Sequence, residues 1–129
     1  MPDGNKPKIL VIDDDDLVRA TIVAVLDRAD VEVSEAADGD VGMRLFEEGG
    51  HDVVITDILM PNREGIETIR DLRRSNEGVK IIAISGGGNI DKMHLLDLAQ
   101  KFGADRVLPN PFTPQQVLTT LDEVLAERA

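Results

Sequence analysis

Short apolar runs alternate with amphipathic segments along almost the whole chain. Segments of strand length, rich in β-branched residues, fall at 8–12, 31–35, 53–57, 79–84 and 106–108. The segment at 31–35 alternates apolar and polar residues, as a half-exposed strand does, and the others are mostly apolar. Apolar positions recur at helical spacing over 16–29, 40–48, 64–74, a segment ending near 101, and 114–125. Five strands alternating with five helices through short links predict a single α/β domain. Its fold would be a doubly wound parallel sheet with helices on both faces.

Polar side chains stand where several of these strands end. Asp13 and Asp14 follow the first strand, and Asp57 ends the third. Ser85 ends the fourth strand, and Asn110 lies in the turn after the fifth. The carboxyl ends of parallel strands share one edge of the sheet, which is where open α/β sheets bind their ligands. We therefore expect these side chains to converge on one patch.

The acidic run at 13–16 has two explanations. Asp15 and Asp16 stand where a helix begins, and a capping role explains them as well as a binding role does. Asp13 and Asp14 precede the cap, so they need another explanation. Carboxylates held close to Asp57 repel one another, and either one keeps its proton or a divalent cation such as Mg²⁺ neutralises them. Beside Mg²⁺, Asp57 is a candidate nucleophile for phosphoryl transfer.

Composition narrows the class of protein. The chain has 129 residues, no cysteine and a formal net charge of −11. That charge argues against direct binding to nucleic acid, which needs clustered Lys and Arg. The absence of an apolar run of transmembrane length, of a signal peptide and of cysteine favours the cytoplasm and no membrane partner. We expect a loosely ordered tail at 1–7, one domain at 8–127, and His51 and His94 at surface or helix positions.

An ordered set of motifs runs along the chain: ILVIDDD at 9–15, Asp57 followed by Met60, Pro61 and Gly65, then Ser85, then Gly103, Ala104 and Asp105, and finally Pro111 and Phe112. This set is similar to that of the receiver domain of two-component response regulators, of the chemotaxis-regulator type. The resemblance runs from about residue 8 to residue 125. It implies the flavodoxin-like strand order 2-1-3-4-5.

The resemblance implies a signalling domain and not a conventional enzyme. Asp57 would accept a phosphoryl group from the histidine of a sensor kinase or a phosphotransfer protein. Asp13, Asp14, Asp57 and the Leu59 carbonyl would hold Mg²⁺, and Ser85 would move toward the phosphoryl group. The movement of Ser85 would shift a two-state equilibrium on the face formed by the fourth helix, the fifth strand and the fifth helix. A homodimer through the fourth and fifth helices is a further hypothesis.

Two positions depart from the pattern of the family. Asn110 stands where the family normally carries lysine, and Val107 where many members carry Tyr or Phe. An asparagine donates a hydrogen bond but does not offset charge. Two hypotheses follow: a phosphorylated receiver, or a degenerate receiver that acts as a phosphorylation-independent interaction module. A more remote alternative is a haloacid-dehalogenase-like phosphatase, in which Asp14 begins a DxDxV motif and is the nucleophile.

Overall fold

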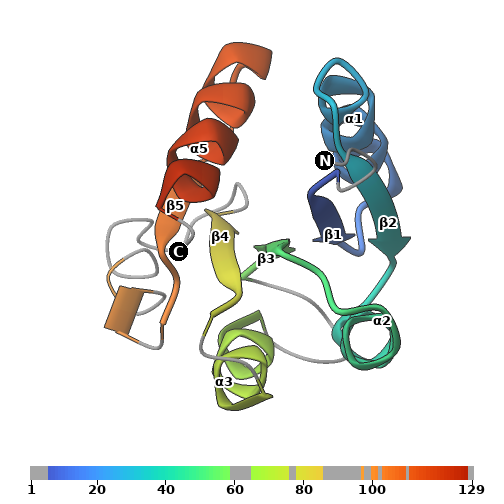
Figure 1. Ribbon diagram of the computed structural model, residues 1–129, viewed down its shortest axis with the longest axis vertical. Coiled ribbons are helices and arrows are strands. Elements are labelled where there is room, and N and C mark those ends of the chain that lie inside the picture. The colour runs from blue at the N-terminus through green and yellow to red at the C-terminus, as the bar shows by residue number, and fades with distance from the viewer. Residues whose placement is uncertain are drawn as a thin grey trace.

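A five-stranded parallel sheet with helices on both faces organises the chain (Figure 1). The computed structural model describes residues 6–58, 65–75, 78–85, 97, 100–101, 103–109 and 111–127. The strands are β1 (Lys8–Ile12), β2 (Glu32–Ala36), β3 (Val53–Asp57), β4 (Lys80–Ser85) and β5 (Arg106–Pro109). Their order in the sheet is β2-β1-β3-β4-β5, which confirms the fold and the strand order expected from the sequence.

The helices in the described part of the chain are α1 (Asp16–Leu26), α2 (Gly39–Gly49), α3 (Gly65–Ser75) and α5 (Pro114–Ala126). The predicted helix between β4 and β5 lies largely outside the described residues. Within its range residues 97, 100 and 101 are described, and all three are helical. Helix α1 ends earlier than predicted, because the N–H groups of Arg28 and Ala29 bond to carbonyls three residues back and form a tighter turn. No helix among the described residues has both the length and the apolar composition needed to cross a bilayer.

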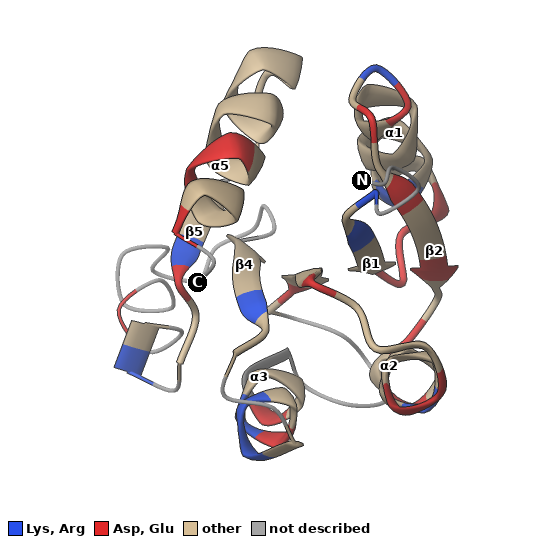
Figure 2. Cartoon of the chain, in the orientation of Figure 1, with Lys and Arg blue, Asp and Glu red and all other residues tan. Residues whose placement is uncertain are grey.

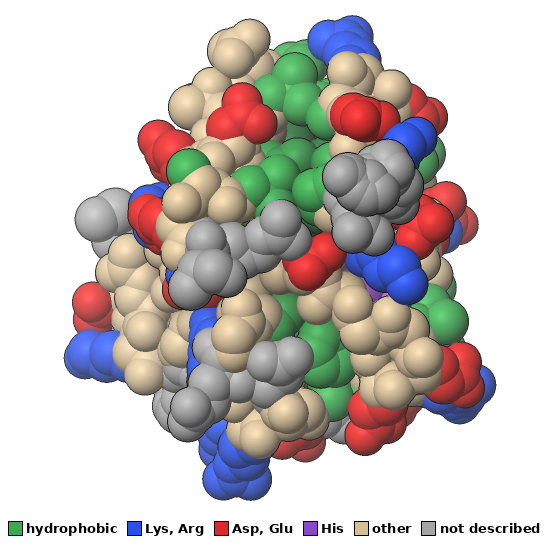
Figure 3. Space-filling view, in the orientation of Figure 1, with side chains coloured by type: hydrophobic (Ala, Val, Ile, Leu, Met, Phe, Trp, Pro, Cys, Tyr) green, Lys and Arg blue, Asp and Glu red, His purple; other side chains and the backbone are tan. Residues whose placement is uncertain are grey.

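Each face of the sheet carries its own hydrophobic core. One core packs the sheet against α1 and α5, and some of its apolar side chains are visible between these helices in Figure 3. The other packs it against α2 and α3. Along β3, Val53 and Ile55 belong to the first core and Val54 to the second, and all five residues of the strand are buried. Burial on both faces explains the uninterrupted apolar run that leads to Asp57.

His51 is buried and lies in the link between α2 and β3, so the surface or helix position expected from the sequence is wrong. Its ring stacks on Phe46 with the centroids 6.3 Å apart, and its Nε2 lies 3.3 Å from Ser34 Oγ. Burial, together with the positive charge of Lys8, lowers the pKa of His51 below 6.5. The apolar contact surface that Phe46 provides for His51 is formed only when α2 packs on the sheet. A lone histidine in a sequence does not reveal such a contact.

Replacing Gly42 tests how tightly α2 packs on the end of β1. A Cβ atom at Gly42 would lie 2.4 Å from Ile12 Cδ1 and 2.7 Å from its Cγ1, and Ile12 is fully buried. We expect Gly42→Ala to lower the free energy of unfolding by about 1–2 kcal/mol, because overpacking outweighs the higher helix propensity of alanine.

Urea unfolding measures this difference. Glu47→Ala on the exposed side of the same helix is the control, and its effect should stay within about 0.5 kcal/mol. A Gly42→Ala protein as stable as the parent would show that Ile12 moves aside at little cost.

Candidate functional site

Strand pairing brings carboxylates of β1 and β3 together. Ile12 at the end of β1 lies opposite Thr56 in β3. Asp13 directly follows β1, and Asp57 is the last residue of β3, so the two lie side by side at the carboxyl edge of the sheet. Side-chain oxygens of Asp13, Asp14 and Asp57 all lie within 4.8 Å of one another. Three of the side chains expected at this edge therefore meet there.

The three carboxylates differ in their exposure to solvent. Asp13 is 1% exposed and Asp57 is 8% exposed, whereas Asp14 is an exposed residue. Burial raises the pKa of Asp13 from 3.8 to about 6. The Asp15 N–H opposes this rise and the charge of Asp14 adds to it. The site therefore contains a buried carboxylate whose negative charge is costly, and a bound cation would offset that cost.

The acidic run divides between the site and the helix. The Asp15 N–H donates to Asp13 Oδ1 at 2.8 Å. Asp15 Oδ1 in turn accepts from two N–H groups in the first turn of α1, at 2.9 and 3.2 Å, so Asp15 is the cap of this helix. Asp16 is the acidic residue of the first turn. Figure 2 shows an acidic stretch where β1 passes into α1. Capping thus explains Asp15 and Asp16, and it leaves Asp13 and Asp14 to the site.

The donor set fits Mg²⁺. This ion takes six oxygen ligands at about 2.1 Å, so ligands on opposite sides of it are about 4.2 Å apart. The carboxylate oxygens, at up to 4.8 Å from one another, need to move by only a fraction of that spacing to share one ion. One or two carboxylates completed by water and phosphate oxygens are the usual protein site for Mg²⁺. Asp13, Asp14 and Asp57 have the chemistry and the spacing for such a site.

The other residues predicted for the site are described in part or not at all. The backbone of Ser85 is at the end of β4, one position beyond Ile84, which pairs with Asp57. This places residue 85 at the same edge of the sheet as the carboxylates. The Ser85 side chain, together with Leu59 and Asn110 as whole residues, lies outside the described part of the chain.

Two residues next to the carboxylates were not predicted from the sequence. The buried Thr56 hydroxyl donates to the Asp57 carbonyl at 3.1 Å. The Arg19 guanidinium donates to the Asp13 carbonyl at 2.6 Å. An arginine three residues after Asp16 indicates a helical ion pair, but nothing in the sequence shows that it also reaches a carbonyl at the end of β1.

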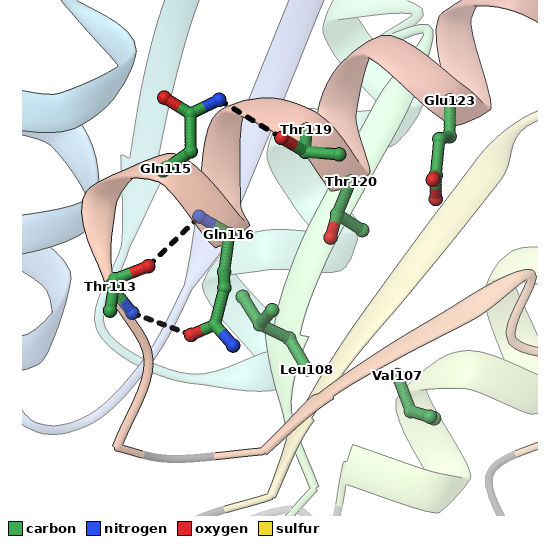
Figure 4. Close-up of a pocket in the computed structure, with 8 residues that line it drawn as sticks. All are labelled: Val107, Leu108, Thr113, Gln115, Gln116, Thr119, Thr120 and Glu123. Carbon is green, nitrogen blue, oxygen red and sulfur yellow. Dashed lines mark hydrogen bonds between the residues drawn. The ribbon is translucent and has the colours of Figure 1, made fainter.

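A separate hollow of about 380 Å³ lies between β5 and α5 (Figure 4). It is lined by Val107, Leu108, Thr113, Gln115, Gln116, Thr119, Thr120 and Glu123, and by none of the three aspartates. Val107 is the position at which the sequence departs from the expected aromatic residue, and here its small aliphatic side chain lines the hollow.

A sheet of order 2-1-3-4-5 with clustered carboxylates at the ends of its first and third strands places the chain in the class of receiver domains. The sequence profile of the response regulator receiver domain matches residues 9–122. The chain belongs to this family, the receiver domains of two-component response regulators.

Proteins of several kinds contain a similar domain. Sensor kinase CckA of Brucella abortus is 34% identical over 93% of this chain and 13% of that protein. Chemotaxis protein CheY of Halobacterium salinarum is 30% identical over 92% of this chain and 96% of that protein. The crystal structure of a receiver domain protein from Clostridium thermocellum matches with a TM-score of 0.86 and 31% identity, covering 94% of this chain and 95% of the other. The chain spans about half the length, 49%, of the CpxR transcriptional regulatory proteins that it matches.

Proposed function

We propose that Asp57 accepts a phosphoryl group from a phosphohistidine of a sensor kinase or a phosphotransfer protein, with Mg²⁺ held by Asp13, Asp14 and Asp57. The observation that carries this proposal is the meeting of three carboxylates, within 4.8 Å, at the carboxyl ends of β1 and β3. The Leu59 carbonyl and the Ser85 hydroxyl complete the proposed site by their positions in the sequence.

Among the three carboxylates, Asp57 is the best nucleophile. One carboxylate oxygen of Asp13, Oδ1, already accepts a hydrogen bond from the Asp15 N–H. Asp57 ends a strand that is paired on both sides, and Thr56 holds its carbonyl, so its position is fixed. A fixed nucleophile lowers the entropic cost of the in-line attack.

The proposed reaction leaves most of the work to positioning. A carboxylate oxygen of Asp57 bonds to phosphorus, the bond from phosphorus to the donor imidazole breaks, and the imidazole keeps the electron pair and takes up a proton. Asp57 then carries an acyl phosphate. Bound Mg²⁺ supplies positive charge against the phosphoryl oxygens. Asp13 and Asp14 would hold that ion, and Ser85 would donate a hydrogen bond to the transferred group.

Treatment with a small acyl phosphate donor and Mg²⁺ tests the proposal. Intact-mass spectrometry should show one phosphoryl group on the parent and on the control Asp122→Asn, which removes an exposed carboxylate of α5. We expect Asp57→Asn and metal-depleted parent to gain none. Asp14→Asn should be labelled more slowly than the parent, because it weakens metal binding only. Peptide mapping of this variant should still find the phosphoryl group on Asp57.

The alternatives predict other patterns. Label on Asp14 that survives Asp57→Asn would indicate the phosphatase-like chemistry. A parent that binds Mg²⁺ but gains no label would support the degenerate receiver, and Asn110→Lys should then restore labelling. The cytoplasmic location, the boundaries 1–7 and 8–127, and a homodimer through the fourth and fifth helices stay predictions from the sequence.

A further inference from the structure

The guanidinium of Arg19 joins three segments around the turn between β1 and α1. It donates to the Asp13 carbonyl at 2.6 Å and to Asp16 Oδ1 at 2.6 Å, and its Nε lies 3.3 Å from Glu35 Oε1. These acceptors belong to the end of β1, the first turn of α1 and strand β2. The Arg19 side chain is 16% exposed, and its contact with the Asp13 carbonyl is partly shielded from water, whereas the contacts with Asp16 and Glu35 are exposed.

These contacts complete the set of bonds that fixes Asp13. Its N–H donates to the Ala36 carbonyl of β2 at 3.1 Å, and its Oδ1 accepts from Asp15 at 2.8 Å. Arg19 holds the remaining main-chain group, the carbonyl. The guanidinium therefore reaches Asp13 through the backbone, and it does not occupy the carboxylate that faces Asp14 and Asp57.

We propose that Arg19 is a positioning residue for Mg²⁺ binding, which holds the Asp13–Asp14 turn in its binding geometry before the ion arrives. This inference rests on the proposed function, because it takes the three carboxylates as the Mg²⁺ site. Residues that orient metal ligands without touching the metal commonly change affinity by about 10–100-fold when they are replaced.

The charge of Arg19 considered alone predicts the opposite effect of its replacement on Mg²⁺ affinity. Arg19 is a permanent cation close to the site, and it repels a second cation. If its charge were all that mattered, Arg19→Gln would tighten Mg²⁺ binding. If positioning dominates, Arg19→Gln weakens it. Arg19→Lys separates the two effects further, because lysine keeps the charge but has no planar fork to bridge three acceptors.

The experiment compares the parent with Arg19→Gln, Arg19→Lys and Arg28→Gln. Arg28 is exposed beyond the end of α1, so its replacement removes one positive charge without touching the turn. Isothermal titration gives the Mg²⁺ dissociation constant, and urea unfolding in EDTA gives the stability without metal. We expect the dissociation constant to rise about 10-fold in both Arg19 variants and to stay within about twofold of the parent in Arg28→Gln.

Each result decides the inference. An unchanged or lower dissociation constant in Arg19→Gln overturns it, even if stability in EDTA falls, because a purely structural role would lower stability alone. Parent-like binding by Arg19→Lys overturns the role of the planar fork. If Arg19→Gln does not fold, Arg19→Lys carries the test, since it keeps the aliphatic stem and the charge. A parent that binds no Mg²⁺ would overturn the proposed function itself, which is a distinguishable result.

Discussion

Asp13→Asn should make the metal-free protein more stable than the parent at pH 7.5, by about 2–3 kcal/mol. Asp13 is almost wholly buried, and burial raises its pKa from 3.8 to about 6. An asparagine has nearly the same shape, still accepts the hydrogen bond from Asp15, and carries no charge. The substitution therefore removes the cost of a buried charge while it keeps the turn.

The pH dependence has a definite sign. A carboxyl whose pKa is raised on folding contributes stability below its unfolded pKa, and this stability is lost as the pH rises through the folded value. For Asp13 the loss begins near pH 3.8 and is complete above about pH 6. His51 acts in the opposite direction, because its lowered pKa costs stability as the pH falls through 6.5. The difference between variant and parent cancels the His51 contribution.

Urea unfolding in EDTA at pH 5 and pH 7.5 measures the effect. The stability difference between Asp13→Asn and the parent should be about twice as large at pH 7.5 as at pH 5, because at pH 5 Asp13 has titrated only in part. Asp122→Asn controls for the removal of an exposed carboxylate. Added Mg²⁺ should stabilise the parent and leave Asp13→Asn nearly unchanged. A variant less stable than the parent at pH 7.5 without metal would contradict the buried-charge explanation.

Arg73→Ala is expected to lower the free energy of unfolding by about 2–3 kcal/mol. The Arg73 guanidinium donates to the carbonyls of Val79 and Gly103 at 2.7 and 2.6 Å, and to Asp105 Oδ2 at 2.8 Å. Asp105 Oδ2 also accepts from the Ile81 N–H at 2.8 Å. Removing Arg73 leaves carbonyls without a donor and a half-buried carboxylate without its guanidinium partner, at the start of both β4 and β5.

The neighbouring Arg74 provides a matched control. It is exposed on the same helix, and Arg74→Ala removes the same charge and a similar side chain. Its effect should stay within about 0.5 kcal/mol. Since Arg73 is at the amino ends of β4 and β5, Mg²⁺ affinity should be the same in both variants. Equal losses of stability in the two variants would mean that the contacts of Arg73 contribute no more than a surface charge does.

The sequence carried enough information to predict the fold. The alternation of apolar runs and helical periodicity placed all five strands within about a residue of their observed positions. Because the carboxyl ends of parallel strands share one edge of the sheet, the alternation also placed Asp13, Asp14 and Asp57 on one patch. The strand order that makes the ends of the first and third strands neighbours came from the family resemblance. Helix α1 was predicted too long, since periodicity continues through a turn whose hydrogen bonds have already tightened.

Contacts between distant segments could not be predicted in the same way. Arg73 and Asp105 are far apart in sequence, and Gly103 accommodates the guanidinium with a φ of 119° and no Cβ. The motif at 103–105 was noted as part of the resemblance, but its partner on α3 was not. The position predicted for His51 was wrong for the same reason, because the Phe46 ring that covers it comes from α2. Patterns along a chain report which face a residue is on, and they do not report which side chain meets it.

The pairing of β1 with β3 also decides when the acidic site can exist during folding. Its two halves are separated in the chain by α1, β2 and α2, and a parallel pair forms only after the intervening chain has crossed over the sheet. A partly folded chain with β1, α1 and β2 in place holds Asp13 and Asp14 but not Asp57. Such a form lacks one of the three proposed ligands, so Mg²⁺ would stabilise only the state in which β3 has paired with β1. Mg²⁺ would then act on this protein by slowing its unfolding, with little effect on the rate at which it folds.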